Sequence, residues 1–365
     1  LIFLALVNIA LNSIYGKRIY KHFTGLSFLN VMLGVGISIA ELGVANGPKA
    51  LDAIRKSRNL LIQMKKKIGW LVMDKSRLGD LADIFVEYLN MICLFDLVAF
   101  IRSIDSLEKH RPDLAEAYAA VASLDFGISM ASYLSSLPCY CLPVYDQNRL
   151  IEFEEVYHPL LVDPVANSFS LAGKSALITG SNMAGKTTFI KTVGVNVLLG
   201  QTLNFCLAQK AVFPRLPVKS SISREENLDE GKSYYMVEVE KLLEFIRASR
   251  PGRNILFLID EIYRGTNTVE RIASATAVLN YIGKDNTVLV TTHDIELQDL
   301  LDKNFVMFHF SEQVEGERYF FDYKIKKGPS RSRNAIKLLE LSGYPVQIIS
   351  EASTIAQKLE NNNMR

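Results

Sequence analysis

The stretch Thr179-Gly-Ser-Asn-Met-Ala-Gly-Lys-Thr-Thr188 decides the fold of this chain of 365 residues. It fits the pattern G-x-x-x-x-G-K-[ST], with fixed positions at Gly180, Gly185, Lys186 and Thr187. An apolar, strand-like run precedes it and a helix-compatible run follows it. A strand that feeds such a loop points successive backbone N–H groups into one concavity, and the next helix adds its positive N-terminal end. The pattern therefore predicts a site for the phosphates of a nucleotide rather than a chance glycine turn.

The residue types in this loop suit the chemistry of a nucleotide triphosphate. We expect Lys186 to reach the β- and γ-phosphates and the Thr187 hydroxyl to ligate Mg²⁺. The predicted ATP-binding residues of the loop are Gly180, Ser181, Asn182, Met183, Ala184, Gly185, Lys186, Thr187 and Thr188. The predicted cofactors are therefore ATP and Mg²⁺.

A second apolar run, Asn254–Ile259, ends in two carboxylates, Asp260 and Glu261. Such a run is typical of a buried parallel strand, and ligands bind at the carboxyl ends of the strands in open α/β sheets. We expect Asp260 to hold Mg²⁺, largely through water, and Glu261 to orient or activate the attacking water. The alternative is that the two carboxylates simply begin a solvated loop.

A third strand-like run, Thr287–Thr292, ends in His293 at the same predicted edge. A single histidine is usually structural, but this position favours a side chain that senses the γ-phosphate or the water. The predicted catalytic residues are therefore Lys186, Glu261 and His293.

Ser233 precedes a predicted helix, where a serine most often caps the helix N-terminus. In ATPases that dimerise around nucleotide, such a serine instead contacts the γ-phosphate bound by the partner. The two roles are compatible.

The composition describes an ordinary globular protein of two or three domains, because 49% of residues are hydrophobic and 22% are charged. A net charge of +2 neither requires nor excludes nucleic acid. The four cysteines lack zinc spacing and indicate a reduced, cytosolic protein. They are Cys93, Cys139, Cys141 and Cys206.

The chain divides into a helical region and a region of alternating strands and helices. Long amphipathic helices are predicted from about 22 to 137. The alternation that follows from residue 144 is typical of a sheet flanked by helices. The predicted strands lie near 175–179, 255–260, 287–292, 304–310 and 318–325, and the predicted helices near 185–200, 233–248, 268–282, 331–341 and 345–359.

The sequence opens with an apolar run, Leu1–Leu11, which is followed by Lys17, Arg18 and Lys21. The run is shorter than the roughly 20 residues that span a bilayer. It is either the end of a transmembrane helix, with the basic cluster on the cytoplasmic side, or a core helix. The abrupt charges favour the membrane interpretation. The later apolar run Val31–Ala40 is also short, and we expect it in a core.

Four motifs in this order resemble the MutS mismatch-repair ATPases. They are TGSNMAGKTT at 179–188, GKSYYMVEVEK at 231–241, LFLIDEIYRGTNT at 256–268 and TTHDIEL at 291–297. The resemblance extends over about 150 to 345, and includes His158-Pro159 and the segment Tyr323–Gly328.

The sequence also departs from the family pattern. Ser181 stands where the family usually has Pro, Ala184 and Tyr263 stand where it has Gly, and Val165 falls near its adenine-stacking aromatic. In the family, the mismatch-reading domain with its intercalating Phe-x-Glu lies N-terminal to the regions matched here, and this sequence has no room for it before the helical region. Mismatch recognition therefore has no residue to support it.

The resemblance implies an α/β P-loop NTPase, an ABC-ATPase-like mixed sheet flanked by helices, preceded by a mainly α-helical core and lever domain. It implies an ATPase that dimerises with two composite sites. Ser233 would act in trans, His293 would be the switch histidine, and Arg264–Thr266 would line the interface. The expected divisions are an apolar segment at 1–21, the core and lever at 22–143, the ATPase domain at 144–328 and a dimerisation segment at 329–365.

Two functions are expected from these observations. The first is an ATP-dependent DNA-binding protein, a homodimer whose ATP hydrolysis at composite sites is coupled to clamping DNA in mismatch repair or a related transaction. Basic residues between 55 and 67 are candidates for phosphate contacts. The alternative is a membrane-anchored, MutS-like ATPase switch without mismatch recognition, with its ATPase in the cytoplasm. A transporter ATPase is disfavoured because Gly231-Lys-Ser233 is not a Leu-Ser-Gly-Gly-Gln signature.

Overall fold

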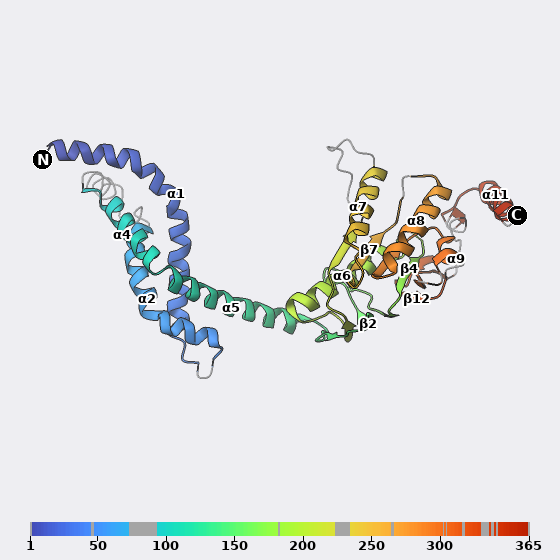
Figure 1. The fold of residues 1–365 in the computed structure, drawn as a ribbon, viewed down its shortest axis with the longest axis horizontal. Coiled ribbons are helices and arrows are strands. Elements are labelled where there is room, and N and C mark those ends of the chain that lie inside the picture. Colours follow the sequence, from blue (N-terminus) through green and yellow to red (C-terminus); the bar gives the residue numbers. More distant parts are fainter. Residues whose placement is uncertain are drawn as a thin grey trace. The chain divides into compact units, whose positions relative to one another are not determined.

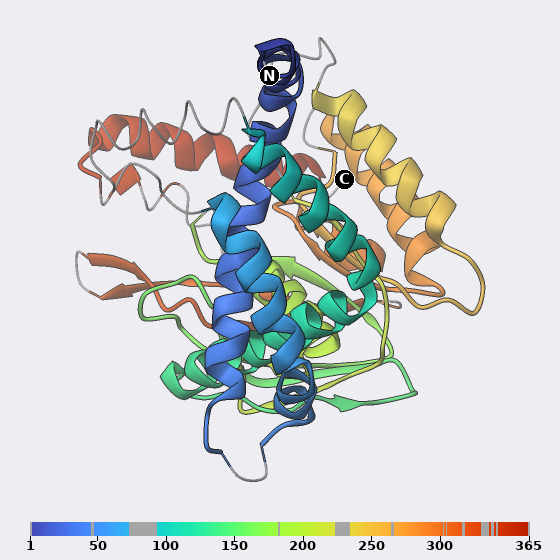
Figure 2. The same ribbon diagram turned by 90° about the vertical axis from the view of Figure 1, so that its left-hand side faces the viewer.

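The computed structural model divides the chain into two compact units, Leu1–Leu137 and Pro138–Arg365. Figures 1 and 2 show their helices and strands in two views. The structure describes residues 2–44, 47–72, 93–181, 183–222, 234–263, 266–301, 303, 305–315, 318–329, 336, 339–340 and 342–363.

The described part of the first unit is helical, as the sequence predicted. Its helices are α1 (Ile2–Ala40), α2 (Lys49–Val72), α4 (Phe95–Lys109) and α5 (Arg111–Ser136). The blue and teal ribbons of Figure 2 show α1, α2 and α4 side by side. The core of this unit includes Leu26 and Leu33 of α1, Leu114 and Ala117 of α5, and Ile54, Leu61, Met64 and Ile68 of α2. The α2 members recur at three- to seven-residue intervals, which is the spacing of one buried helix face.

Helix α1 is continuous through both apolar runs of the N-terminal region. Its inner side places Leu33 in the core, as expected, while Phe28 and Val31 on its outer side are 73% and 64% exposed. Among the described residues, the segment Lys21–Ala40 is long and apolar enough to cross a membrane, with a mean hydropathy of 1.7. A core helix of a soluble protein passes the same test. Membrane attachment stays a prediction.

The second unit is built around a six-stranded sheet with the order β12-β9-β4-β8-β7-β6. Its strands are β4 (Ser175–Thr179), β6 (Val218–Ser221), β7 (Leu256–Asp260), β8 (Thr287–Thr291), β9 (Phe305–His309) and β12 (Lys326–Lys327). Only β12 pairs antiparallel within the described sheet. Strands β4, β7 and β8 are buried throughout, which explains their nearly continuous apolar sequences. These three predicted strands are confirmed, and their carboxyl ends meet at one edge.

Helices cover both faces of this sheet. Helix α6 (Lys186–Leu203) packs on one face, where Ala176 and Ile178 of β4 point. The opposite face, with Leu177, is covered by helices α7 (Tyr234–Ala248), α8 (Thr268–Gly283) and α9 (Leu297–Leu301). The predicted helices near 185–200, 233–248 and 268–282 are therefore confirmed. The tail helix α11 spans Val346–Asn363, whereas most of the helix predicted at 331–341 lies outside the described residues.

Glycine brings α6 unusually close to β7. A Cβ atom added to Gly194 would lie 2.4 Å from Cδ1 of Leu258, so a side chain there would require the Leu258 side chain or the helix to shift. The helix that begins at the glycine loop is thus held directly against the strand that ends at Asp260.

A second sheet, which the sequence analysis did not locate, covers the other side of α6. Its order is β1-β5-β2-β3, and Phe153 stacks between Phe169 and Phe213 in the shared core. Its strands are β1 (Val144–Tyr145), β2 (Leu150–Val156), β3 (Asn167–Ala172) and β5 (Lys210–Phe213). A separate hairpin pairs β10 (Glu312–Glu315) with β11 (Arg318–Phe321), so the strand predicted at 318–325 ends early.

Candidate nucleotide site at the sheet edge

The loop between β4 and α6 uses backbone conformations that require glycine at the predicted positions. Gly180 has φ 140°, and an added Cβ would lie 2.6 Å from the carbonyl oxygen of Phe310. Gly185 has φ 103° and caps the N-terminus of α6. Met183 adopts φ 70° and is 84% exposed, whereas Ala184 is buried. A loop of this shape suits glycine because it has no Cβ atom to clash.

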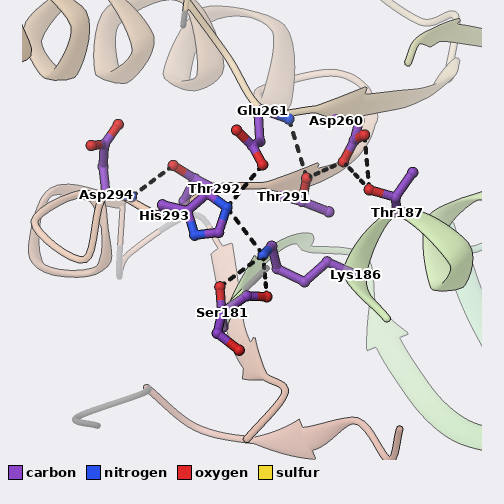
Figure 3. Close-up of polar contacts among 10 residues, drawn as sticks. Ser181, Lys186, Thr187, Asp260, Glu261, Thr291, Thr292, His293 and Asp294 are labelled. Atoms are coloured by element: carbon purple, nitrogen blue, oxygen red, sulfur yellow. Dashed lines mark hydrogen bonds and ion pairs between the residues drawn. The ribbon is translucent and has the colours of Figure 1, made fainter. Parts of the chain in front are cut away.

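Lys186 is the first residue of α6 and turns its ammonium back into the loop (Figure 3). Its Nζ donates to the carbonyl oxygens of Gly180 and Ser181 at 2.7 and 2.8 Å. It also lies 3.3 Å from Nε2 of His293. The side chain is only 5% exposed, so its charge is held inside the curve of the loop.

Asp260 is held between two threonine hydroxyls from different parts of the chain (Figure 3). Thr187 Oγ1 donates to both carboxylate oxygens at 2.9 Å, and Thr291 Oγ1 donates to Oδ1 at 2.7 Å. The carboxylate is buried at the end of β7. Thr291 also binds the backbone N–H of Glu261 at 3.1 Å. Thr291 therefore orients both acidic residues, a role that the sequence analysis missed.

Glu261 and His293 meet at one nitrogen atom. Nε2 of His293 lies 2.9 Å from Oε1 of Glu261 as well as close to the Lys186 ammonium. A protonated Nε2 can donate to the carboxylate, and an unprotonated Nε2 can accept from the ammonium. His293 therefore contacts both of the other residues predicted to be catalytic.

An ion pair supports the loop that carries His293. Arg271 of α8 donates to both carboxylate oxygens of Asp294, at 2.9 and 2.6 Å. These hydrogen bonds raise the pKa of Arg271 above its ordinary value. The backbone N–H of Asp294 in turn donates to Thr292 Oγ1 at 3.0 Å. Arg271 belongs to no motif, so the sequence carried no signal for this contact.

A cavity of about 460 Å³ adjoins the loop. The loop and the carboxylate edge contribute Ser181, Met183, Gly185, Lys186, Thr187, Thr188 and Glu261 to its lining. Other walls include His158, Leu161, Asp163, Pro164, Val165, Asn167 and Tyr323. Burial, and then the nearby Lys191 ammonium, lower the pKa of His158. Six loop residues and Glu261 thus line a single cavity large enough for a small ligand.

Asn167 joins two walls of this cavity that are distant in sequence. Its Nδ2 donates to the carbonyl oxygens of Val165 and Tyr323 at 3.2 and 3.0 Å, and its Oδ1 accepts from Ile325 N–H at 2.7 Å. Tyr323 has φ 51°, and its Cδ1 would lie 3.4 Å from a Cβ added to Gly185. An aromatic ring therefore flanks the glycine loop, although Val165 is not aromatic. The sequence analysis had assigned neither Asn167 nor Tyr323 to the site.

Several predicted residues cannot be placed. Asn182, Ser233, Arg264 and Gly265 lie outside the described residues. Their predicted roles in phosphate binding, in trans contacts and at a dimer interface stay predictions.

The architecture and the site define a mixed α/β domain with a glycine-loop site at the carboxyl edge of its sheet. The family described as MutS domain V matches residues 176–360, which is half of the chain. The chain therefore belongs to the MutS family.

Similar proteins include three DNA mismatch repair proteins. The MutS protein of Leuconostoc mesenteroides is 33% identical over 257 residues, which cover 66% of this chain and 30% of that protein. The MutS protein of Chlamydia muridarum is 28% identical over 275 residues, covering 70% and 33% respectively. MSH3 of Phaeosphaeria nodorum is 28% identical over 280 residues, which cover 72% of this chain and 25% of that protein. The chain thus spans a quarter to a third of the length of these relatives.

Proposed function

We propose that this chain is a P-loop ATPase of the MutS type that binds DNA under the control of ATP. The observation that supports the proposal best is the convergence of Lys186, Asp260, Glu261 and His293 beside the glycine loop. These residues come from two strand ends and one helix start, so the fold rather than local sequence brings them together.

The donor set fits ATP and Mg²⁺. Thr187 and Asp260 offer adjacent hydroxyl and carboxylate oxygens, which are the hard ligands that Mg²⁺ prefers. The Ser181 hydroxyl lines the cavity and is buried without a hydrogen-bond partner among the described residues, so a ligand would satisfy it. Bound Mg²⁺ would neutralise charge on the phosphates.

In this proposal the side chains divide the work of hydrolysis. Lys186 leaves the carbonyl oxygens of Gly180 and Ser181 and binds the β- and γ-phosphates. Glu261 orients the attacking water or accepts its proton. His293 contacts Glu261 and the γ-phosphate region, and so links the state of the nucleotide to the acidic edge.

The proposal of DNA binding rests on relatives whose names describe DNA mismatch repair. We infer that ATP binding closes a homodimer through Ser233 and the segment Arg264–Thr266 of each chain, and that hydrolysis reopens it. Recognition of mismatched bases is not part of the proposal.

The test is the ATPase rate of the chain with homoduplex, mismatched and branched DNA, each at two salt concentrations. We expect DNA to change the rate, with an effect that weakens as salt rises. Lys186→Ala should abolish hydrolysis with every substrate. Hydrolysis that depends on Lys186 but that no DNA alters would refute the DNA-binding part and favour the membrane-anchored switch.

A further inference from the structure

Helix α2 carries an unusual concentration of positive charge. Between Lys49 and Val72 it has seven basic side chains and a single acidic one, Asp52. The whole chain is nearly neutral, so this helix is a local basic surface. A local surface of this kind determines attraction for a polyanion more than the total charge does.

The two arginines of α2 are already engaged within the helical unit. Arg55 donates to the carbonyl oxygens of Leu42 and Val44 at 2.7 and 2.8 Å and lies near Asp52. Arg58 pairs with Glu41 at 2.7 Å. The arginines therefore stabilise the α1–α2 connection and occupy the nearby carboxylates.

Lys67 donates to Ser106 Oγ at 2.8 Å, but two other lysines of α2 are left for other partners. Lys56 and Lys66 are exposed and have no ion pair or hydrogen bond with any residue that the structure describes. Asn59 and Gln63 are exposed between them. Positions 56, 59, 63 and 66 recur at three- and four-residue intervals, so these side chains share the outward face of the helix. This outward face lies on the side of the helix opposite the buried Leu61 and Ile68.

A separate lysine lies in a groove between α1 and α2. Lys65 lies beside α1, where its Nζ is only 2.9 Å from the position of a Cβ on Gly34. Together with Asn30 and Ser38 it lines an open groove of about 480 Å³. The side-chain oxygen of Asn30 is buried without a partner among the described residues. That oxygen is a hydrogen-bond acceptor, so a donor rather than a phosphate would satisfy it, and the groove is not part of the outward face.

We propose that the outward face of α2, formed by Lys56, Asn59, Gln63 and Lys66, binds the phosphate backbone of duplex DNA. The proposal rests on the proposed DNA-binding function and names the surface that performs it. From Lys56 to Lys66 the helix rises by about 15 Å, which is roughly four phosphates along one strand. Asn59 and Gln63 favour DNA over a lipid surface, because a helix that inserts into lipid needs large apolar side chains between its lysines.

The experiment compares two double variants of the full chain by fluorescence anisotropy with a labelled 30-base-pair homoduplex, from about 50 to 300 mM salt. The test variant is Lys56→Gln with Lys66→Gln. The matched control is Lys174→Gln with Lys284→Gln, which removes the same charge from exposed lysines of the sheet unit. Thermal melting by circular dichroism verifies that both variants fold.

The expected result is a loss of about 1.8 from the slope of log affinity against log salt in the test variant, since each phosphate contact contributes about 0.9. The control should keep the wild-type slope. Equal losses in both variants would show that only net charge matters and would overturn the proposal.

Two further outcomes separate this proposal from the proposed function. If the wild type binds DNA and neither variant changes the slope, the α2 proposal fails while DNA binding stands. If the wild type binds no DNA, both fail, and Lys186-dependent hydrolysis still tests the ATPase. Cosedimentation with phosphatidylserine vesicles that requires Lys56 and Lys66, without DNA binding, would assign the surface to lipid and also overturn the proposal.

Discussion

The two units of this protein use charge in opposite ways. In the sheet unit, Lys186 and Asp260 are almost fully buried and each is held by several partners at fixed distances. In the helical unit, Lys56 and Lys66 are exposed and unpaired among the described residues, over a core that is almost entirely apolar. Buried, oriented charge is suited to chemistry on one ligand. Exposed charge acts over about 10 Å and is screened by salt.

The largest effect that sharpens this comparison should come from Glu261→Gln. Loss of the carboxylate removes the group that orients or activates water, so ATP hydrolysis should fall by about 100-fold or more. ATP binding, measured with a fluorescent analogue, should persist and trap a nucleotide-bound dimer. Glu116→Gln on the exposed surface of α5 is the matched control and should leave the rate unchanged. Wild-type hydrolysis by Glu261→Gln would disprove the assigned role.

Gly194→Ala should show how tightly the sheet unit is packed. The new methyl group would overlap Cδ1 of Leu258, so the Leu258 side chain or α6 would have to shift. We expect the free energy of unfolding to fall by about 1–3 kcal/mol. Chemical denaturation followed by far-UV circular dichroism measures this free energy. An unchanged midpoint would mean that this close approach is dispensable.

Asn167→Ala should weaken nucleotide binding more than it slows chemistry. The variant loses the three hydrogen bonds that join the segment at Val165 to that at Tyr323. The KM for ATP should rise about tenfold, equivalent to about 1.4 kcal/mol, with kcat within a factor of three. Asn148→Ala, at an exposed loop position, serves as the control. A fall in kcat at constant KM would contradict a role confined to the cavity wall.

The smallest effect, of opposite sign, is expected for Gly127→Ala in the helical unit. Gly127 lies inside α5 with no atom within 4 Å of an added Cβ. Alanine loses less conformational entropy on folding than glycine, so the variant should gain about 0.5–1 kcal/mol in stability. The same denaturation experiment measures it. Destabilisation would show that something covers this part of α5 in solution.

The sequence alone located much of the sheet edge. The glycine loop and the strands that end at Asp260 and before His293 were predicted because each is a local pattern: a fixed motif, or an apolar run followed by polar residues. Their meeting followed from the geometry of parallel strands. In the structure, Lys186 contacts His293, His293 contacts Glu261, and Thr187 contacts Asp260.

The sequence did not reveal the cavity walls or the supporting contacts. Asn167 and Ile325 are 158 positions apart, and Arg271 and Asp294 belong to a helix and a loop without a shared motif. Such pairs are set by tertiary packing. The second sheet was overlooked although Asn167–Ala172 alternates buried and exposed residues. That period of two was the signal that could have indicated it.

The close approach of α6 and β7 at Gly194 has a consequence for the entropy of ligand binding. The glycine loop leads into α6, and β7 ends at Asp260, so the two halves of the site are braced against each other before any ligand arrives. The conformational entropy of these segments is lost when the domain folds, not when the nucleotide binds. A preorganised site of this kind keeps more of its contact energy as affinity.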